Sequence, residues 1–395
     1  MEVEVKNNID WRSLTAITVV QGTITLCWVI YALYLPELLT ELGFSRQLAG
    51  QLLIAEHFLE MAIEPTFGYL SDRNDNLLGY RFPYITLGIL LSASFFIILP
   101  MVTFGLSSDN FTRYLLPTLA VIWASVMAIF RSPLVALIAR VAPPPELPIA
   151  ASFLTLIQQL ISALRFTAYG FILSLGSLFT FAIGSFALLL GAFTLRRMTP
   201  ASLTAKKSDD FTFSSSFSQI ITIFFIGSGI GLGLRFMFAI LPQIIDRNFG
   251  SESIEMGMFI FNIVLACSAL LAGKLASKLG VFTAIITALI ITSLSFILAN
   301  QSLPVAIIII LLILVGFCFS TVFSTMIPVV LNIIPQVNSG FGVGMFFAGF
   351  SGGLNFFDIF INTEVTLTLF ITKAIICWLI TALIIYLYSW QISEQ

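Results

Sequence analysis

Residues 303–330 read LPVAIIIILLILVGFCFSTVFSTMIPVV, a run of 28 residues without a charged side chain. A helix of about 20 apolar residues is long enough to cross the hydrocarbon layer of a bilayer. The apolar character extends over the whole chain, because 58% of its 395 residues are hydrophobic and only 10% are charged. Soluble domains carry about 25% charged residues. The sequence therefore predicts an all-α polytopic membrane protein.

Twelve apolar runs are long enough to span a membrane. The predicted spans are 13–35, 47–70, 82–104, 115–139, 149–173, 176–195, 218–242, 254–276, 280–300, 303–330, 339–362 and 365–389. The longest hydrophilic stretch, 196–218, divides them into two sets of six. We therefore predict an N-terminal six-helix bundle over 1–195, a cytoplasmic linker over 196–217 and a C-terminal six-helix bundle over 218–395.

Composition and spacing argue against several other classes. A transmembrane β-barrel would show short segments of alternating polarity, and the apolar runs here are uninterrupted. The net charge of −2 gives no basic surface for nucleic acid. The four cysteines lack CxxC spacing and His57 is the only histidine, so neither a metal site nor a cofactor is expected. No catalytic constellation is visible, and an enzyme is not expected.

The distribution of basic residues predicts the orientation in the membrane, because cytoplasmic loops are enriched in Lys and Arg. With a cytoplasmic N-terminus, the inner segments hold eleven basic residues: Lys6, Arg12, Arg73, Arg81, Arg140, Arg196, Arg197, Lys206, Lys207, Lys274 and Lys278. The outer segments hold three, Arg46, Arg113 and Arg247. Both termini are therefore predicted to be cytoplasmic.

The two halves show weak internal symmetry. Gly68-Tyr-Leu-Ser-Asp-Arg73 follows the second span, and Gly273-Lys-Leu-Ala-Ser-Lys278 follows the eighth, at the matching place in the other half. Repeated halves of six spans are typical of transporters whose binding site lies between the halves.

The loop after the second span resembles the signature loop of the major facilitator superfamily. The longer form Glu64-Pro-Thr-Phe-Gly-Tyr-Leu-Ser-Asp-Arg73, followed after five residues by Gly79-Tyr-Arg-Phe-Pro-Tyr-Ile85, is similar to the glycoside–pentoside–hexuronide:cation symporters and their sucrose-transporter relatives. Arg131-Ser-Pro-Leu-Val-Ala-Leu137 with Pro143 also resembles that group. This resemblance implies two pseudo-symmetric bundles, alternating access and a sugar-like solute. Residues 78–85 also resemble a bacteriochlorophyll-delivery branch of the superfamily.

Five residues of this loop are candidates for a conformational latch. They are Gly68, Asp72, Arg73, Gly79 and Arg81. A glycine permits close approach of another helix. The carboxylate of Asp72 can accept hydrogen bonds from the N-terminus of a neighbouring helix, or pair with Arg73 or Arg81. We expect these contacts to form on the cytoplasmic face and to break during switching.

Charged residues within the spans are the candidates for binding protons and solute. Glu56, Glu60 and Glu64 are spaced by four, so they form one stripe on the second span, beside His57. A charge at the bilayer centre costs about 2.5–3.5 kcal/mol, so this stripe should face protein or a water-filled cavity. Candidate cations are Arg131 in the fourth span, Arg165 in the fifth and Arg235 in the seventh. Glu60, which lies near the membrane centre, is the preferred coupling residue.

The leading hypothesis is a secondary active transporter in a bacterial plasma membrane. It would act as a monomer and move a small polar solute, a sugar or glycoside by resemblance, in symport with protons. No Walker A sequence is present, so ATP is not the expected driver. The alternative is an accessory protein with a transporter fold that binds or delivers a pigment or a lipid-like molecule.

The charge bias makes a testable prediction about topology. In a variant without native cysteines, a thiol introduced by Ser251→Cys should react with an impermeant maleimide added to intact cells. A thiol introduced by Ser208→Cys should react only after the membrane is permeabilised. Reaction of the Ser208 variant in intact cells would reverse the predicted orientation.

Overall fold

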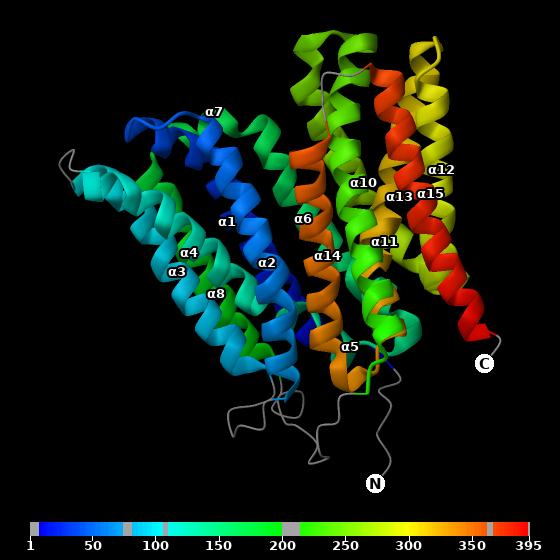
Figure 1. The fold of residues 1–395 in the computed structure, drawn as a ribbon, viewed down its shortest axis with the longest axis horizontal. Coiled ribbons are helices and arrows are strands. Elements are labelled where there is room, and N and C mark those ends of the chain that lie inside the picture. Colours follow the sequence, from blue (N-terminus) through cyan, green and yellow to red (C-terminus); the bar gives the residue numbers. More distant parts are fainter. Residues whose placement is uncertain (1–7, 74–80, 106–109, 200–213, 362–365, 394–395) are drawn as a thin grey trace.

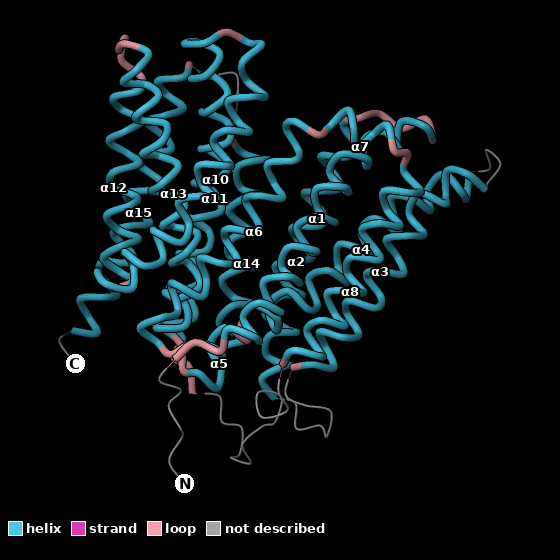
Figure 2. The backbone as a smooth tube through the Cα atoms, turned by 180° about the vertical axis from the view of Figure 1, so that it is seen from behind, coloured by secondary structure: helices cyan, strands magenta, loops and turns pink. Residues whose placement is uncertain are grey.

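The computed structural model describes residues 8–73, 81–105, 110–199, 214–361 and 366–393, and every regular element in these ranges is a helix (Figures 1 and 2). The long helices are α1 (Trp11–Glu41), α2 (Gln47–Arg73), α3 (Phe82–Gly105), α4 (Asn110–Val135), α6 (Leu147–Thr167), α8 (Ser177–Met198), α10 (Phe217–Phe249), α11 (Ile254–Leu279), α12 (Val281–Ala299), α13 (Val305–Ile333), α14 (Ser339–Phe360) and α15 (Leu367–Ser393). Two short helices, α5 (Ile138–Val141) and α7 (Tyr169–Ser174), and 3-10 turns connect some of them.

Each predicted span corresponds to one of these twelve long helices, which confirms the polytopic all-α fold. Within the described ranges, eleven helices are long and apolar enough to cross a membrane. The long helix that falls outside this set is α2, because Glu56, Glu60 and Glu64 interrupt its apolar sequence. It packs between α14 and α4, so protein rather than lipid surrounds its charged side.

Two predicted spans are each split into a long helix and a short one. Span 115–139 leaves the regular α-helix after Val135, where the amide of Leu137 bonds to the carbonyl of Leu134, a tighter turn than in an α-helix. Span 149–173 is divided at Ala168 between α6 and α7. The chain then turns at Gly176, whose φ of 80° is a conformation that favours glycine.

The helices pack in two groups. In the first, α1 packs on α6 and α8, α3 packs on α4 and α8, and α2 packs on α4. In the second, α10 packs on α14 and α15, and α13 packs on α11 and α12. The groups meet where α2 packs on α14 and α6 packs on α11. We call the end where α2 ends and α14 begins the lower end, as in Figure 1, where the groups lie close together there and diverge toward the upper end.

The predicted division into 1–195 and 218–395 follows the same two groups and stays a prediction, because no boundary between them is tested. Most of the predicted linker, residues 200–213, lies outside the described residues.

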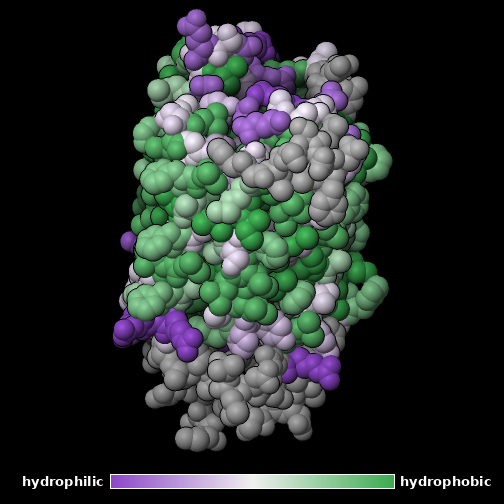
Figure 3. All heavy atoms as spheres, turned by 90° about the vertical axis from the view of Figure 1, so that its left-hand side faces the viewer, coloured by the Kyte–Doolittle hydropathy of each residue, from purple (hydrophilic) through white to green (hydrophobic). Residues whose placement is uncertain are grey.

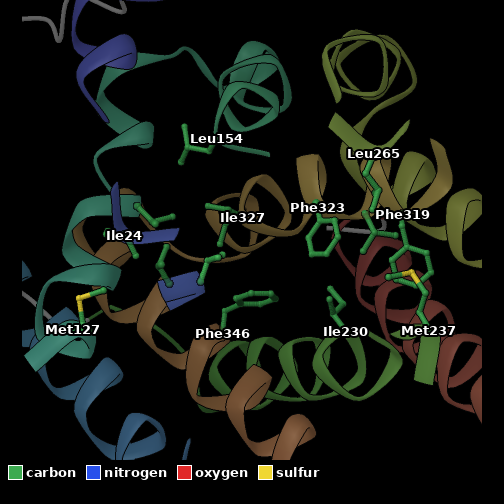
Figure 4. Close-up of a cluster of buried hydrophobic side chains, with 14 of the residues drawn as sticks. Ile24, Met127, Leu154, Ile230, Met237, Leu265, Phe319, Phe323, Ile327 and Phe346 are labelled. Carbon is green, nitrogen blue, oxygen red and sulfur yellow. The ribbon is translucent and has the colours of Figure 1, made fainter. Parts of the chain in front are cut away.

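The surface between the two ends is apolar. Large side chains such as Phe186, Leu271 and Ile310 are more than 60% exposed. In Figure 3 hydrophobic residues form a broad band between polar ends on the face shown. Other apolar side chains fill the interior, where Leu154, Ile327 and Phe346 belong to one cluster drawn from both helix groups (Figure 4). This band is the surface expected to contact lipid.

Glycines allow α10 and α14 to pack with their backbones in close approach. A β-carbon built on Gly231 would overlap the carbonyl oxygen of Phe350, and one built on Gly353 would overlap the carbonyl oxygen of Ser228. Backbone atoms cannot move aside as a flexible side chain does. Gly231 and Gly353 therefore serve close packing of α10 on α14.

This packing predicts the effect of a single methyl group. Gly231→Ala should destabilise the protein by about 1–3 kcal/mol, because the helices must separate to accept the β-carbon. The measurement is the thermal unfolding temperature of the purified protein in detergent. Gly50→Ala is the matched control, since nothing lies within 4 Å of its β-carbon position. Equal unfolding temperatures for the two variants would contradict this account of the helix contact.

Candidate functional site

The three glutamates of α2 are buried on one side of the helix, as the spacing predicts. Their exposed fractions are 1% for Glu56, 3% for Glu60 and 0% for Glu64. Phe58 and Leu59, between them in sequence, are exposed. The carboxylates therefore face other helices, namely α1, α4 and α14, and each meets different chemistry there.

Arg131 of α4 binds two of the three carboxylates. Its Nε donates to Glu64 Oε1 at 2.5 Å, and a terminal nitrogen lies 3.3 Å from Glu60 Oε2. The guanidinium also lies over the ring of Phe347 in α14, 4.5 Å from its centroid. The neighbouring Ser132 donates to the backbone carbonyl of Glu64 at 3.0 Å. One cation thus serves two buried carboxylates, which leaves one unit of negative charge unless a proton binds.

Glu60 connects the two helix groups. Its Oε2 accepts a hydrogen bond of 2.6 Å from Ser351 of α14, in addition to its contact with Arg131 of α4. Glu60 is therefore the carboxylate of the stripe that touches both a cation in the first group and a hydroxyl in the second. A change in its charge would act on both contacts.

Glu56 has a different environment. Tyr31 of α1 donates a hydrogen bond to its Oε1, and its Oε2 is buried without a hydrogen-bond partner. The ring of Tyr31 lies 4.6 Å from that of Trp123, in an aromatic cluster. Among the described residues no Lys or Arg pairs with Glu56. Glu56 therefore differs from Glu60 and Glu64 in having no cationic partner there.

A second polar layer lies above Glu60 and Glu64, at the level of Glu56. His57 Nδ1 lies 3.2 Å from Asn355 Oδ1, and the amide of Asn355 donates to the carbonyl of Ile54 at 3.1 Å. Arg235 of α10 forms an ion pair with Asp358 of α14. These contacts place His57 and Arg235, both predicted site residues, around the upper half of α14.

Arg165 is not brought to the glutamates. It lies in the last turn of α6 and is exposed, and it forms no ion pair within the described part of the chain. Among the described residues, Arg131 is thus the candidate cation that pairs with the glutamates of α2, whereas Arg235 pairs with Asp358.

Sequence reasoning missed the residues that α1 and α14 contribute. They are Tyr31, Ser351, Asn355 and Asp358. The last three are spaced by four and three, so they lie on one face of an apolar span, and that spacing is the signal that could have identified them.

The predicted latch residues lie at the lower end. Asp72 accepts hydrogen bonds from the backbone amides of Gly340 at 3.0 Å and Phe341 at 2.7 Å, and it forms a buried ion pair with Arg81. A β-carbon on Gly68 would overlap the carbonyl of Gly340. Asp72 thus caps the first turn of α14, a helix of the other group, as the sequence suggested.

The remaining latch candidates differ in outcome. Arg81 also donates to Ser339 at 2.8 Å, which adds a second contact to α14. Arg73 is exposed. Gly79 lies outside the described residues.

Gly273, which the internal repeat aligns with Gly68, allows a similar close contact between α6 and α11. A β-carbon on Gly273 would lie 2.7 Å from the carbonyl oxygen of Pro148 and from Ser152. Ser277 donates to the carbonyl of Pro145. Gly68 and Gly273, which the internal repeat aligns, therefore each allow close contact between the helix groups at the lower end.

Comparisons with known proteins agree on the fold. The sequence profile of the Major Facilitator Superfamily matches residues 17–356. A comparison with curated proteins gives no match.

Among solved structures, the human organic anion transporter MFSD10 is 15% identical over 96% of this chain and 98% of its own, with a TM-score of 0.67. A bacterial homologue of the iron transporter ferroportin in an outward-facing state is 12% identical over 96% and 99%, with a TM-score of 0.72. The same kind of homologue soaked with iron is 13% identical over the same shares, with a TM-score of 0.71. At these identities the likeness concerns the fold alone.

The cap on α14 predicts how the lower end responds to loss of one charge. Asp72→Asn should weaken the cap and the ion pair by about 1–2 kcal/mol, because hydrogen bonds to a charged acceptor are stronger than those to a neutral one. The lower end should then open more often. A thiol introduced by Ser152→Cys, at a fully buried position against Gly273, should react roughly tenfold faster with a maleimide.

The labelling experiment uses a background in which the exposed Cys267 is replaced by Ser. Asp246→Asn, at an exposed position of α10, is the control for a general effect of losing a carboxylate. Unchanged labelling in Asp72→Asn would remove Asp72 from the latch.

Proposed function

Because the chain belongs to the Major Facilitator Superfamily, we propose that it is a secondary active transporter that moves a small polar solute across the membrane in symport with protons. The observation that carries the proposal is the pair Glu60 and Glu64 on the single cation Arg131. Two buried carboxylates with one cation bind a proton readily, because the proton removes the uncompensated charge. The resemblance to glycoside–cation symporters suggests a sugar or glycoside as solute.

Glu60 is the proposed coupling residue, because its charge state affects both helix groups. When ionised, it accepts hydrogen bonds from Ser351 and from Arg131. When protonated, it no longer offers Arg131 a full charge, and Arg131 is left to Glu64. Proton binding would thus change a contact across the interface between α2 and α14, which is where a carrier must rearrange.

Alternating access would proceed by opening and closing the two ends in turn. The lower end is held closed by the Asp72 cap on α14 and by the close contacts at Gly68 and Gly273. Breaking these contacts would require the cap and the Arg81 ion pair to separate together. We propose that the lower end faces the cytoplasm of a bacterium, as the basic residues of the loops suggest.

A second candidate function has support from one apolar groove. The groove lies between α10, α14 and α15, has a volume of about 390 Å³, and is lined by residues that include Phe225, Phe356 and Ile380. These side chains are about half exposed. Such a surface suits a pigment or another lipid-like molecule, as in an accessory delivery protein. A pigment that copurifies with the protein and is lost when Phe225 and Phe356 are replaced by Ala would favour this function.

The coupling proposal predicts different outcomes for two neighbouring glutamates. In proteoliposomes with an imposed pH gradient, Glu60→Gln should abolish accumulation of solute above its outside concentration and retain solute exchange, because Gln keeps the shape and cannot ionise. Glu56→Gln should accumulate solute, because Glu56 contacts Tyr31 and neither Arg131 nor Ser351, so its charge is not linked to the contact between the groups. A screen of radiolabelled sugars and glycosides with the parent protein supplies the solute.

Two results would contradict the coupling role. If Glu60→Gln accumulates solute as the parent does, Glu60 is not the coupling residue. If Glu60→Gln fails to fold or insert whereas Glu60→Asp does both but still accumulates no solute, the residue is a structural partner of Arg131.

A further inference from the structure

Two arginines from opposite helix groups, Arg165 and Arg235, lie toward the upper end from Glu60 and Glu64, and the coupling proposal uses neither. Arg165 lies eleven residues after Leu154 on α6, which is close to three turns, so both side chains leave the same face of the helix. Leu154 belongs to the central cluster, together with Ile24, Ile327 and Phe346 (Figure 4). Arg165 therefore leaves α6 on the side that faces the other helix group.

Arg235 approaches the same region from α10. Its ion pair with Asp358 leaves the Arg235 side chain 37% exposed, so the guanidinium is open to further partners. The helix of Asp358, α14, also carries Asn355, which contacts His57 of α2, so Arg235 lies at the polar layer where the two groups meet. Arg165 and Arg235 thus approach the region between the groups from opposite sides.

The charges of this layer do not balance. Arg165 and Arg235 contribute two positive charges and Asp358 contributes one negative charge. Among the described residues, Glu60 and Glu64 pair with Arg131 and Glu56 accepts a hydrogen bond from Tyr31, so none of the three forms an ion pair with Arg165 or Arg235. In an apolar span an arginine without a counter-ion is costly, and such residues usually mark a path for a solute or an ion.

We propose that Arg165 and Arg235 together bind an anionic group, a carboxylate or a phosphate, of the transported solute. The proposal rests on the transporter function proposed above and assigns a class to its solute. Guanidinium groups suit this task, because their planar array of donors binds carboxylate and phosphate through two parallel hydrogen bonds. His57 and Asn355, which lie in the same layer, can receive polar groups of the solute.

Because Arg165 and Arg235 belong to different helix groups, a solute bound to both would also affect the opening and closing of the upper end. In the empty protein two like charges face each other across the groups, and their repulsion opposes approach of the upper ends. An anion between them replaces repulsion by two attractive contacts, one to each group. Binding of an anionic solute should therefore favour closure of the upper end, whereas a neutral analogue lacks this effect.

The test compares matched neutral and anionic compounds on the full-length protein in detergent. The probes are glycerol, glycerate and glycerol 3-phosphate, together with glucose, gluconate and glucose 6-phosphate. Stabilisation against heat reports binding without any gradient. We expect at least one anion to raise the unfolding temperature well above its neutral partner, and Arg165→Gln to weaken its binding roughly 10- to 100-fold.

Conservative and distant variants keep the test specific. Arg165→Lys should recover part of the binding, because it restores charge without the bidentate geometry. Arg46→Gln removes an exposed arginine that pairs with Glu37 away from this layer, and it should bind as the parent does. Equal responses to anions and neutral partners, or an anion response that survives Arg165→Gln, would overturn the proposal.

A lipid headgroup could supply the same chemistry, so the measurement is repeated in nanodiscs of phosphatidylcholine alone and of phosphatidylcholine with phosphatidylglycerol. Stabilisation by the soluble anion in phosphatidylcholine alone supports the solute site. Stabilisation that depends on phosphatidylglycerol, and is lost in Arg165→Gln, would assign the arginines to lipid and overturn it. If the protein binds the anion but a pH gradient does not drive uptake, the result would contradict proton coupling and leave the anion site standing.

Discussion

The ion pairs of Arg131 with Glu60 and Glu64 are the interaction on which the rest of the arrangement depends. Charges within a membrane span are tolerated where they meet one another, and α2 carries Glu56, Glu60 and Glu64 within its span. This requirement turns the stripe toward α4 and α14 and away from lipid. It also brings Ser351 of α14 to Glu60, so the charge balance within one helix group is linked to its contact with the other.

Close backbone packing provides the second part of the account. Gly68 and Gly273 allow α14 and α6 to approach at the lower end, and Asp72 uses that proximity to cap α14. These contacts are short and numerous, yet few of them involve interlocked side chains. At these positions the groups meet through glycine, backbone and one capped helix end, which suits a protein that must open there.

Much of the fold could be predicted from the sequence, because apolar runs and their lengths decide which helices span. The stripe of α2 and the partners of Asp72 were also predictable, since they follow from spacing by four and from the chemistry of a helix N-terminus. The spacing of Asp358 with Ser351 and Asn355 marks a polar face of its helix, but the partners of Asp358 and Tyr31 could not be assigned in this way. Each lies on a different helix from its partner, and single residues in apolar runs do not reveal which span they face. The separation of Arg165 from the carboxylates likewise depends on helix packing.

The central claim is that the charge of Glu60 controls the relative position of the two helix groups. The most direct measurement is the distance between spin labels introduced by Glu41→Cys and Glu252→Cys, at exposed upper positions of α1 and of the turn before α11, as a function of pH. The account predicts two distance populations whose ratio changes with pH in the parent and is independent of pH in Glu60→Gln. The same pH dependence in both proteins would contradict it.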